Sequence, residues 1–107
     1  MSGITTHVLD VARGRPAAGI AVTLEIRRDD RWERIGNGET DADGRLRSLT
    51  STDIDAGTYR ITFDSGAYNP EGFFPRVAIE FDVRDPAQHY HVPLLLSPFG
   101  YSTYRGS

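Results

Sequence analysis

Residues 89–107 read HYHVPLLLSPFGYSTYRGS, and the rest of the chain is organised around this segment. Its first half is an apolar run of strand length. Ser97-Pro98 brings that run to an end, because a proline cannot donate a hydrogen bond to a sheet ladder. Large aromatic residues follow, although a solvated chain end usually has few of them. The segment therefore predicts one long strand, a turn, and a short strand whose aromatic side chains pack against something else.

Upstream, apolar residues alternate with polar ones in the way that half-buried strands require. The clearest case is residues 20–27, where Ile20, Val22, Leu24 and Ile26 share one face. Further strands are predicted at residues 4–11, 32–36, 46–49, 59–63 and 77–83. Turn residues separate these strands, including Asn37-Gly38, which is a strong hairpin signal. Residues 12–19 and 66–75 contain several glycines and prolines and are predicted to be loops.

Seven or eight short strands without helical periodicity predict an all-β fold, a two-sheet antiparallel sandwich. The chain has 107 residues, and a chain of this length buries roughly 65% of its unfolded surface on folding. That is enough for one thin core between two layers. We therefore expect residues 1–107 to form a single domain.

Composition excludes several classes of partner. The net charge is −3 with acidic and basic residues interspersed, so no basic face for nucleic acid or an anionic membrane is expected. No stretch approaches the roughly 20 apolar residues of a spanning helix. With 0 cysteines there is neither a disulfide framework nor a thiolate metal site. Little sequence precedes the first strand, so no signal peptide is expected and a cytoplasmic location is the default.

Four polar residues could carry chemistry. His7 lies within a predicted strand, where a histidine is more often structural than catalytic, and the same applies to His91. His89 precedes His91 by two residues, so both occupy one face of their strand. Arg45 follows a glycine turn, where an arginine is usually solvated, and Ser107 carries no signal by itself. The residues alone therefore do not decide whether these side chains are catalytic or only structural.

Metal binding is a minor alternative. The pair His89 and His91 has a spacing that metal ligands use on strands, but only scattered acidic residues accompany it. Residues 39–44 look like the first half of a calcium loop. Thr50, however, occupies the position where a bidentate glutamate is needed. We expect no metal and no cofactor, and residues 40–45 are predicted to form a tight turn with Gly44 at positive φ.

Four motifs in order resemble the 5-hydroxyisourate hydrolases, the transthyretin-related enzymes of urate breakdown. They are TTHVLD at residues 5–10, DGR at residues 43–45, HYHVPLLLSP at residues 89–98 and the closing YRGS. This resemblance covers essentially the whole chain and implies a transthyretin-like (prealbumin-like) sandwich. Members of that family usually have a short helix after the strand ending near Ser65. Here residues 66–75 are expected to form a loop instead.

The resemblance also implies an activity, the ring-opening hydrolysis of 5-hydroxyisourate to 2-oxo-4-hydroxy-4-carboxy-5-ureidoimidazoline in urate catabolism. It implies a catalytic set of His7, Arg45 and His91, and a substrate-binding set of Tyr104, Arg105 and Ser107. Hydrolysis of a cyclic amide needs a base for water and a positive group for the carbonyl oxygen, which histidine and arginine supply. We further hypothesise that the charge of Arg45 disfavours protonation of His7 and His91, keeping them basic.

The resemblance implies a homotetramer in which subunits pair edge to edge and two dimers pack face to face, with the purine-derived substrate bound at the dimer–dimer interface. The alternative is a non-catalytic carrier of a small ligand on the transthyretin fold. That class is expected to have apolar or acidic residues at His7, Arg45 and His91, and no YRGS ending. An accessory sandwich module is a third possibility, which the aromatic tail disfavours.

Overall fold

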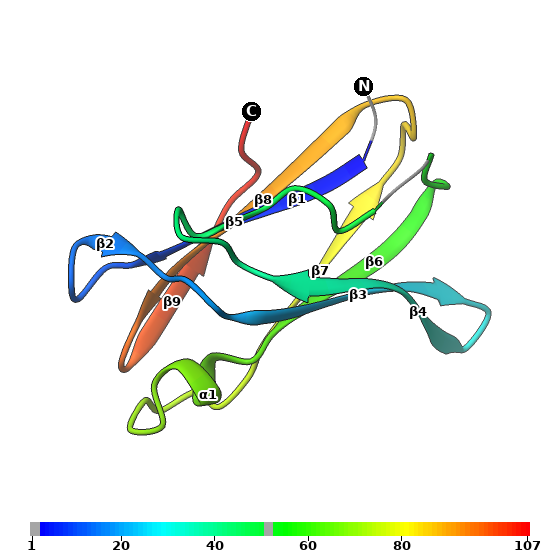
Figure 1. Ribbon diagram of the computed structural model, residues 1–107. Helices are drawn as coiled ribbons and strands as arrows, with labels where there is room; N and C mark the ends of the chain where they lie inside the picture. Colours follow the sequence, from blue (N-terminus) through cyan, green and yellow to red (C-terminus); the bar gives the residue numbers. More distant parts are fainter. Residues whose placement is uncertain (1–2, 51–52) are drawn as a thin grey trace.

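Two β-sheets pack face to face in the computed structural model, which describes residues 3–50 and 53–107 (Figure 1). The first sheet contains β1 (Gly3–Asp10), β2 (Arg15–Pro16), β5 (Arg45–Leu46), β8 (His89–Ser97) and β9 (Gly100–Thr103). Its order is β2-β1-β8-β9, and β5 also pairs with β1. The second sheet contains β3 (Ala21–Arg28), β4 (Arg31–Glu39), β6 (Gly57–Phe63) and β7 (Val77–Val83), in the order β4-β3-β6-β7. The predicted all-β sandwich is confirmed.

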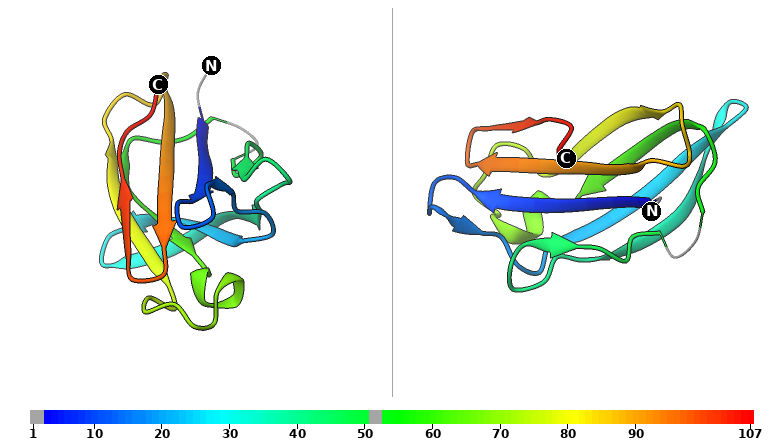
Figure 2. Two further views of the ribbon diagram at one scale, coloured as in Figure 1. Left: turned by 90° about the vertical axis from the view of Figure 1, so that its left-hand side faces the viewer. Right: turned by 90° about the horizontal axis from the view of Figure 1, so that it is seen from above.

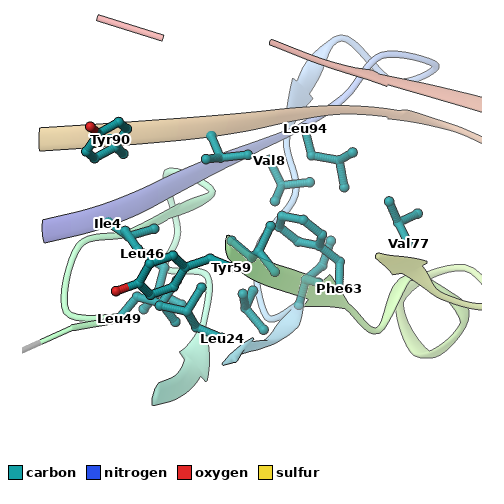
Figure 3. Packing of buried hydrophobic residues seen from close by; sticks show 14 of the residues in the cluster. Ile4, Val8, Leu24, Leu46, Leu49, Tyr59, Phe63, Val77, Tyr90 and Leu94 are labelled. Carbon is teal, nitrogen blue, oxygen red and sulfur yellow. The ribbon is translucent and has the colours of Figure 1, made fainter. Parts of the chain in front are cut away.

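The core lies between the sheets and is built by the predicted alternation. Val8 and Leu94 of the first sheet face Tyr59 and Phe63 of the second, and all four are buried (Figure 3). The four apolar residues predicted at residues 20–26 are buried as well. Burying one such side chain contributes roughly 1.5–3 kcal/mol. Because every second residue of β1 and β8 is held in this core, the residues between them are turned to the outer face of the first sheet.

One pairing differs from the predicted antiparallel arrangement. Strands β1 and β8 run parallel, with Gly3 opposite His89 and Asp10 opposite Leu96. A parallel pair cannot be joined by a hairpin and needs a crossover connection. Here the connection contains the whole second sheet together with β2 and β5, so the pairing could not be deduced from neighbouring strands. The structure also has nine strands within the described residues, because the two-residue β2 forms in the predicted loop at residues 12–19.

The predicted turn at Asn37-Gly38 is wrong, because both residues lie inside β4, opposite Thr23 and Val22 of β3. The physical reason is packing. The segment that follows β5 lies so close to β4 that a Cβ at Gly36 would overlap the carbonyl oxygen of Leu49. The glycines serve this close approach rather than a turn. The strand predicted at residues 46–49 is correspondingly shorter, since β5 ends at Leu46.

The expected loop at residues 66–75 begins with a helical turn, α1 (Ser65–Tyr68). The Asp64 side chain caps it by accepting a hydrogen bond from the Ala67 amide at 3.3 Å. The short helix that the family resemblance implied is therefore present, and only the part after Tyr68 is irregular. Within the described residues, no helix has the length and apolar character needed to cross a membrane.

Candidate functional site

The predicted catalytic residues meet on the outer face of the first sheet. His7 of β1 is paired with Arg45 of β5 on one side and with Pro93 of β8 on the other. Thr5, on the same face of β1, is paired with His91. The right-hand view of Figure 2 looks onto this face, where β1 and β8 lie side by side and the C-terminal segment ends near β8. The strand register therefore assembles His7, Arg45 and His91 from three separate parts of the sequence.

The hydrogen bond of His7 fixes its tautomer. Its Nε2 lies 2.9 Å from the backbone carbonyl oxygen of Asp43. A carbonyl oxygen can only accept, so Nε2 carries the proton and donates it to Asp43. In the neutral ring this leaves the lone pair on Nδ1. His7 can therefore accept a hydrogen bond or a proton through Nδ1.

The turn before β5 positions Arg45 and the Asp43 carbonyl together. Asp41 Oδ1 accepts hydrogen bonds from the amides of Asp43 and Arg45, both at 2.9 Å. Gly44 has the predicted positive φ of 76°, and its carbonyl accepts from the Val8 amide at 2.8 Å. The hydrogen bond from the Arg45 amide is the main reason why the pKa of Asp41 is lowered, with the Asp43 amide and the Arg47 and Arg45 charges contributing in the same direction. The Asp41 carboxylate thus holds the turn closed, and the Gly44 carbonyl ties the turn to β1 beside His7.

His91 is held from two directions. Its Nδ1 lies 2.8 Å from Thr5 Oγ1, and its backbone carbonyl accepts a hydrogen bond from the Gly106 amide at 2.8 Å. Burial lowers the pKa of His91, and the positive charges of His7, His89 and Arg45 lower it further, against an opposing hydrogen bond that the ring donates to the Thr5 backbone. Arg45 therefore acts on His91 in the hypothesised direction, but burial is the larger cause. His91 is kept neutral, as a base at neutral pH must be.

We expect the pKa of His91, followed by ring NMR shifts, to lie below the 6.5 of an unperturbed imidazole. Because the folded protein binds this proton less readily than the unfolded chain does, the free energy of unfolding should fall as the pH drops below that value. The control is an unfolded sample in denaturant, which should titrate near the unperturbed value. A folded-state midpoint at or above it would contradict the burial argument.

The terminal residues do not all lie beside the histidines. The Arg105 guanidinium lies over the Tyr90 ring, 4.5 Å from its centroid, and donates to Gln88 Oε1 at 2.9 Å. Tyr90 points into the core, on the opposite side of β8 from His91. Tyr104 and Arg105 line a recess of about 220 Å³ beside β7. Within one chain they face away from His91, so their substrate-binding role stays a prediction.

Ser107 is exposed and follows Gly106, which pairs with His91. That pairing brings the chain end to the histidines, in keeping with the prediction for Ser107 but without a side-chain contact to test it. Among residues 3–50 and 53–107, no three histidine, cysteine, aspartate or glutamate side chains gather around a point where a metal ion could bind.

Sequence analysis missed Thr5 and Gly106. Thr5 could have been found from its spacing, since it precedes His7 by two residues on a strand and must share its face. Gly106 is part of the closing motif, but its role needs the structure. A Cβ at Gly106 would lie 2.6 Å from His91 Cδ2 and 3.3 Å from Pro93 Cγ. Only glycine lets the C-terminal segment lie against the His91 ring.

Replacing Gly106 with alanine should therefore displace the ring of His91. We expect a loss of roughly 10- to 100-fold in the turnover of whatever reaction His91 serves, because misplacement by about 1 Å is that costly. Gly100→Ala is the matched control, since its added Cβ would meet only Ser97 Oγ at an ordinary 3.6 Å. Equal activity of the two variants would show that the close approach of Gly106 does not position His91.

The chain is similar to several known proteins. A sequence model described as the HIUase/Transthyretin family matches residues 4–106. The 5-hydroxyisourate hydrolase of Salmonella typhimurium is 44% identical over 109 residues, covering 97% of this chain and 80% of that protein. The structure of the Klebsiella pneumoniae 5-hydroxyisourate hydrolase superposes with a TM-score of 0.89 at 37% identity, covering 100% of both chains.

Sea bream transthyretin in complex with thyroxine is also similar, with a TM-score of 0.90 at 34% identity over 96% of this chain and 93% of that one. The fold is thus shared by an enzyme and a protein that binds thyroxine, so the fold alone does not distinguish the two. Because the family model matches nearly its whole length, this chain belongs to the HIUase/Transthyretin family.

Proposed function

We propose that this chain hydrolyses 5-hydroxyisourate to 2-oxo-4-hydroxy-4-carboxy-5-ureidoimidazoline in urate breakdown. The observation that carries the proposal is the meeting of His7, Arg45 and His91 on one sheet face, where strand pairing sets Arg45 directly opposite His7. The relatives named 5-hydroxyisourate hydrolase support the same activity. The reaction needs a neutral base and a fixed cation, and this face supplies both.

The chemistry follows from the two kinds of side chain. A water molecule attacks the ring carbonyl and forms a carbon–oxygen bond, while His91 takes the proton that the water loses. The Arg45 guanidinium pairs with the carbonyl oxygen as negative charge develops there. The ring carbon–nitrogen bond then breaks, and the proton held by His91 returns to the leaving nitrogen. His7, with its free Nδ1, accepts a hydrogen bond from the water or from a substrate N–H.

We further propose that the working form is a homotetramer, with edge-paired dimers packed face to face and the sites between them. The outer face of the first sheet carries half-buried Leu9 and Leu95 beside the histidines. Phe99, Tyr101 and Tyr104 are large and exposed, at 78%, 42% and 58% of their surface. A second copy packed on the outer face would cover these leucines and enclose the substrate. A copy paired along β9, which lies at the edge of its sheet, would cover part of the aromatic surface. A stable monomer in sedimentation equilibrium at micromolar concentration would contradict this assembly.

The carrier alternative rests on the similarity to transthyretin bound to thyroxine. The site combines a neutral histidine with a fixed arginine. Hydrolysis requires both groups, whereas binding of a carried ligand does not, so they favour the hydrolase. The test mixes the purified protein with 5-hydroxyisourate freshly made from urate and follows its absorbance against spontaneous decay. Loss at the spontaneous rate, together with calorimetric binding of thyroxine, would favour the carrier.

We propose a cytoplasmic location, in keeping with a chain that has 0 cysteines and so needs no oxidising compartment. We propose no cofactor, since water, a base and a cation suffice for amide hydrolysis. Fractionation of cells that express the untagged protein would test the location. Loss of activity on dialysis against a chelator would contradict the cofactor-free mechanism.

A further inference from the structure

A single hydroxyl group joins the two histidines of β8. Thr5 Oγ1 lies 2.8 Å from His91 Nδ1 and 3.0 Å from His89 Nε2. The two imidazole rings are 6.4 Å apart between centroids and are inclined by only 26°. Thr5 and His91 are half-buried, whereas His89 is exposed. His89, which sequence analysis left without a role, is therefore connected to His91 through Thr5.

The hydrogens in this chain can be counted. A hydroxyl group has one hydrogen and two acceptor lone pairs, so Thr5 Oγ1 can donate to only one of the two histidines. These histidines are its only hydrogen-bond partners among the described residues, so when it donates to one it accepts from the other. In the first arrangement His91 Nδ1–H donates to Oγ1, and Oγ1–H donates to His89 Nε2. In the second arrangement both hydrogen bonds are reversed, and His91 carries its proton on Nε2. The two arrangements place the lone pair of neutral His91 on different nitrogens.

Only the first arrangement suits a base. It leaves the lone pair of His91 on Nε2, the nitrogen that Thr5 does not occupy. When Nε2 takes a proton from water, Nδ1–H continues to donate to Thr5, so no hydrogen bond has to reorganise during the reaction. This arrangement requires His89 to be neutral, because its Nε2 must accept. If His89 is protonated, its Nε2–H becomes a donor and the chain reverses.

We propose that Thr5 and His89 are positioning residues, which together hold His91 in the tautomer that can act as base. This inference rests on the proposed hydrolase function. Protonation of His89 reverses both hydrogen bonds and removes the free lone pair from His91 Nε2. Catalysis then requires two neutral histidines on β8 rather than one. Acid inactivation of the enzyme accordingly includes the proton of His89 as well as that of His91.

The other charged groups that act on His91 cannot replace Thr5. His7 on β1 has its Nε2–H committed to the Asp43 carbonyl. Arg45 on β5 has no acceptor atom. Both are cationic or become so on protonation, and together with His89 they disfavour a proton on His91. Gly106 contacts His91 through its backbone amide and contributes no charge.

The first test uses three variants in the pH–rate profile of 5-hydroxyisourate loss. Thr5→Val removes the hydroxyl but keeps a β-branched residue in β1, and we expect kcat to fall roughly 5- to 100-fold with little change in KM. Thr5→Ser should restore most of the rate. His89→Gln keeps an acceptor for Thr5 that cannot be protonated. It should retain the rate at neutral pH and reduce the slope of the acid limb by one proton. An unchanged slope, or full activity in Thr5→Val, would overturn the proposal.

The second test needs no substrate. Long-range ¹⁵N–¹H NMR spectra of histidine-labelled protein distinguish the two tautomers of His91. We expect Nδ1–H in the wild type at neutral pH, and a shift towards Nε2–H in Thr5→Val. Nε2–H in the wild type would overturn the inference. If the wild type does not hydrolyse 5-hydroxyisourate, the proposed function fails, whereas the NMR result still decides the hydrogen-bond arrangement.

Discussion

Replacing His91 with asparagine is expected to slow 5-hydroxyisourate hydrolysis by about 10²- to 10⁴-fold, the usual contribution of a general base. Asparagine is the sharpest substitution, because its amide reaches about as far as Nδ1 and can still bond to Thr5 Oγ1, which lies 2.8 Å from Nδ1 in the wild type. It has no atom at Nε2 and cannot take a proton. Stopped-flow absorbance measurements would give kcat and KM, and the loss should appear in kcat.

The control for His91→Asn is the assembly and stability of the variant, measured by sedimentation and thermal unfolding. Because His91 is on the outer face of the sheet and outside the apolar core, both should stay near the wild type. An asparagine variant that is assembled, stable and fully active would show that another group removes the proton from water. His7 Nδ1 would then be the next candidate.

The second large effect is expected at Arg45. Arg45→Ala should lower kcat by about 10²- to 10³-fold, because a fixed donor to the developing oxyanion is lost. Arg45→Lys should recover only part of the rate, since a lysine has one ammonium group in place of a planar fork of donors. Removing the charge should also raise the pKa of His91 towards that of free imidazole, because Arg45 is one of the charges that lower it.

Arg47 is the matched control for Arg45. It lies two residues further on and is exposed, and its positive charge lowers the pKa of Asp41, as that of Arg45 does. Arg47→Ala should keep wild-type kcat and leave the titration of His91 almost unchanged. If Arg45→Ala and Arg47→Ala behaved alike, Arg45 would act through general charge and not through its place beside His7.

Local periodicity was sufficient to predict much of the fold. The alternation in residues 20–27 placed four side chains in the core, and each of them is buried. Strand alternation likewise requires Thr5 and His7 to share one face of β1, where the structure has them. Turn chemistry predicted positive φ at Gly44. These features are determined by a few neighbouring residues, so the local sequence is enough to predict them.

Features that depend on distant contacts were not predictable in this way. The parallel pairing of β1 with β8 joins residues that lie far apart in sequence. Asn37-Gly38 has the composition of a turn but lies in β4, since the glycines of that strand accommodate the close passage of the chain near Leu49. The one-turn helix α1 has no periodic signal and is held by a distant contact, the hydrogen bond that Tyr68 Oη donates to Asp10 Oδ2 at 2.7 Å. In each case a tertiary contact overrides the local signal.

The candidate site shows the same division. Sequence motifs identified His7, Arg45 and His91 through resemblance, and the strand register explains why they meet. The groups that orient them could not be read from composition, because Thr5 and the Asp43 carbonyl act through individual hydrogen bonds. Arg105 was assigned by resemblance, yet its guanidinium lies on Tyr90, across the strand from His91.

The most direct test of the account is the initial rate of 5-hydroxyisourate loss, measured at several protein concentrations for the wild type and for His91→Asn. The account predicts a rate that rises in proportion to wild-type protein, and a rate close to spontaneous decay for the variant. Spontaneous decay with correctly assembled wild type would contradict the hydrolase. Equal catalysis by both proteins would contradict the site.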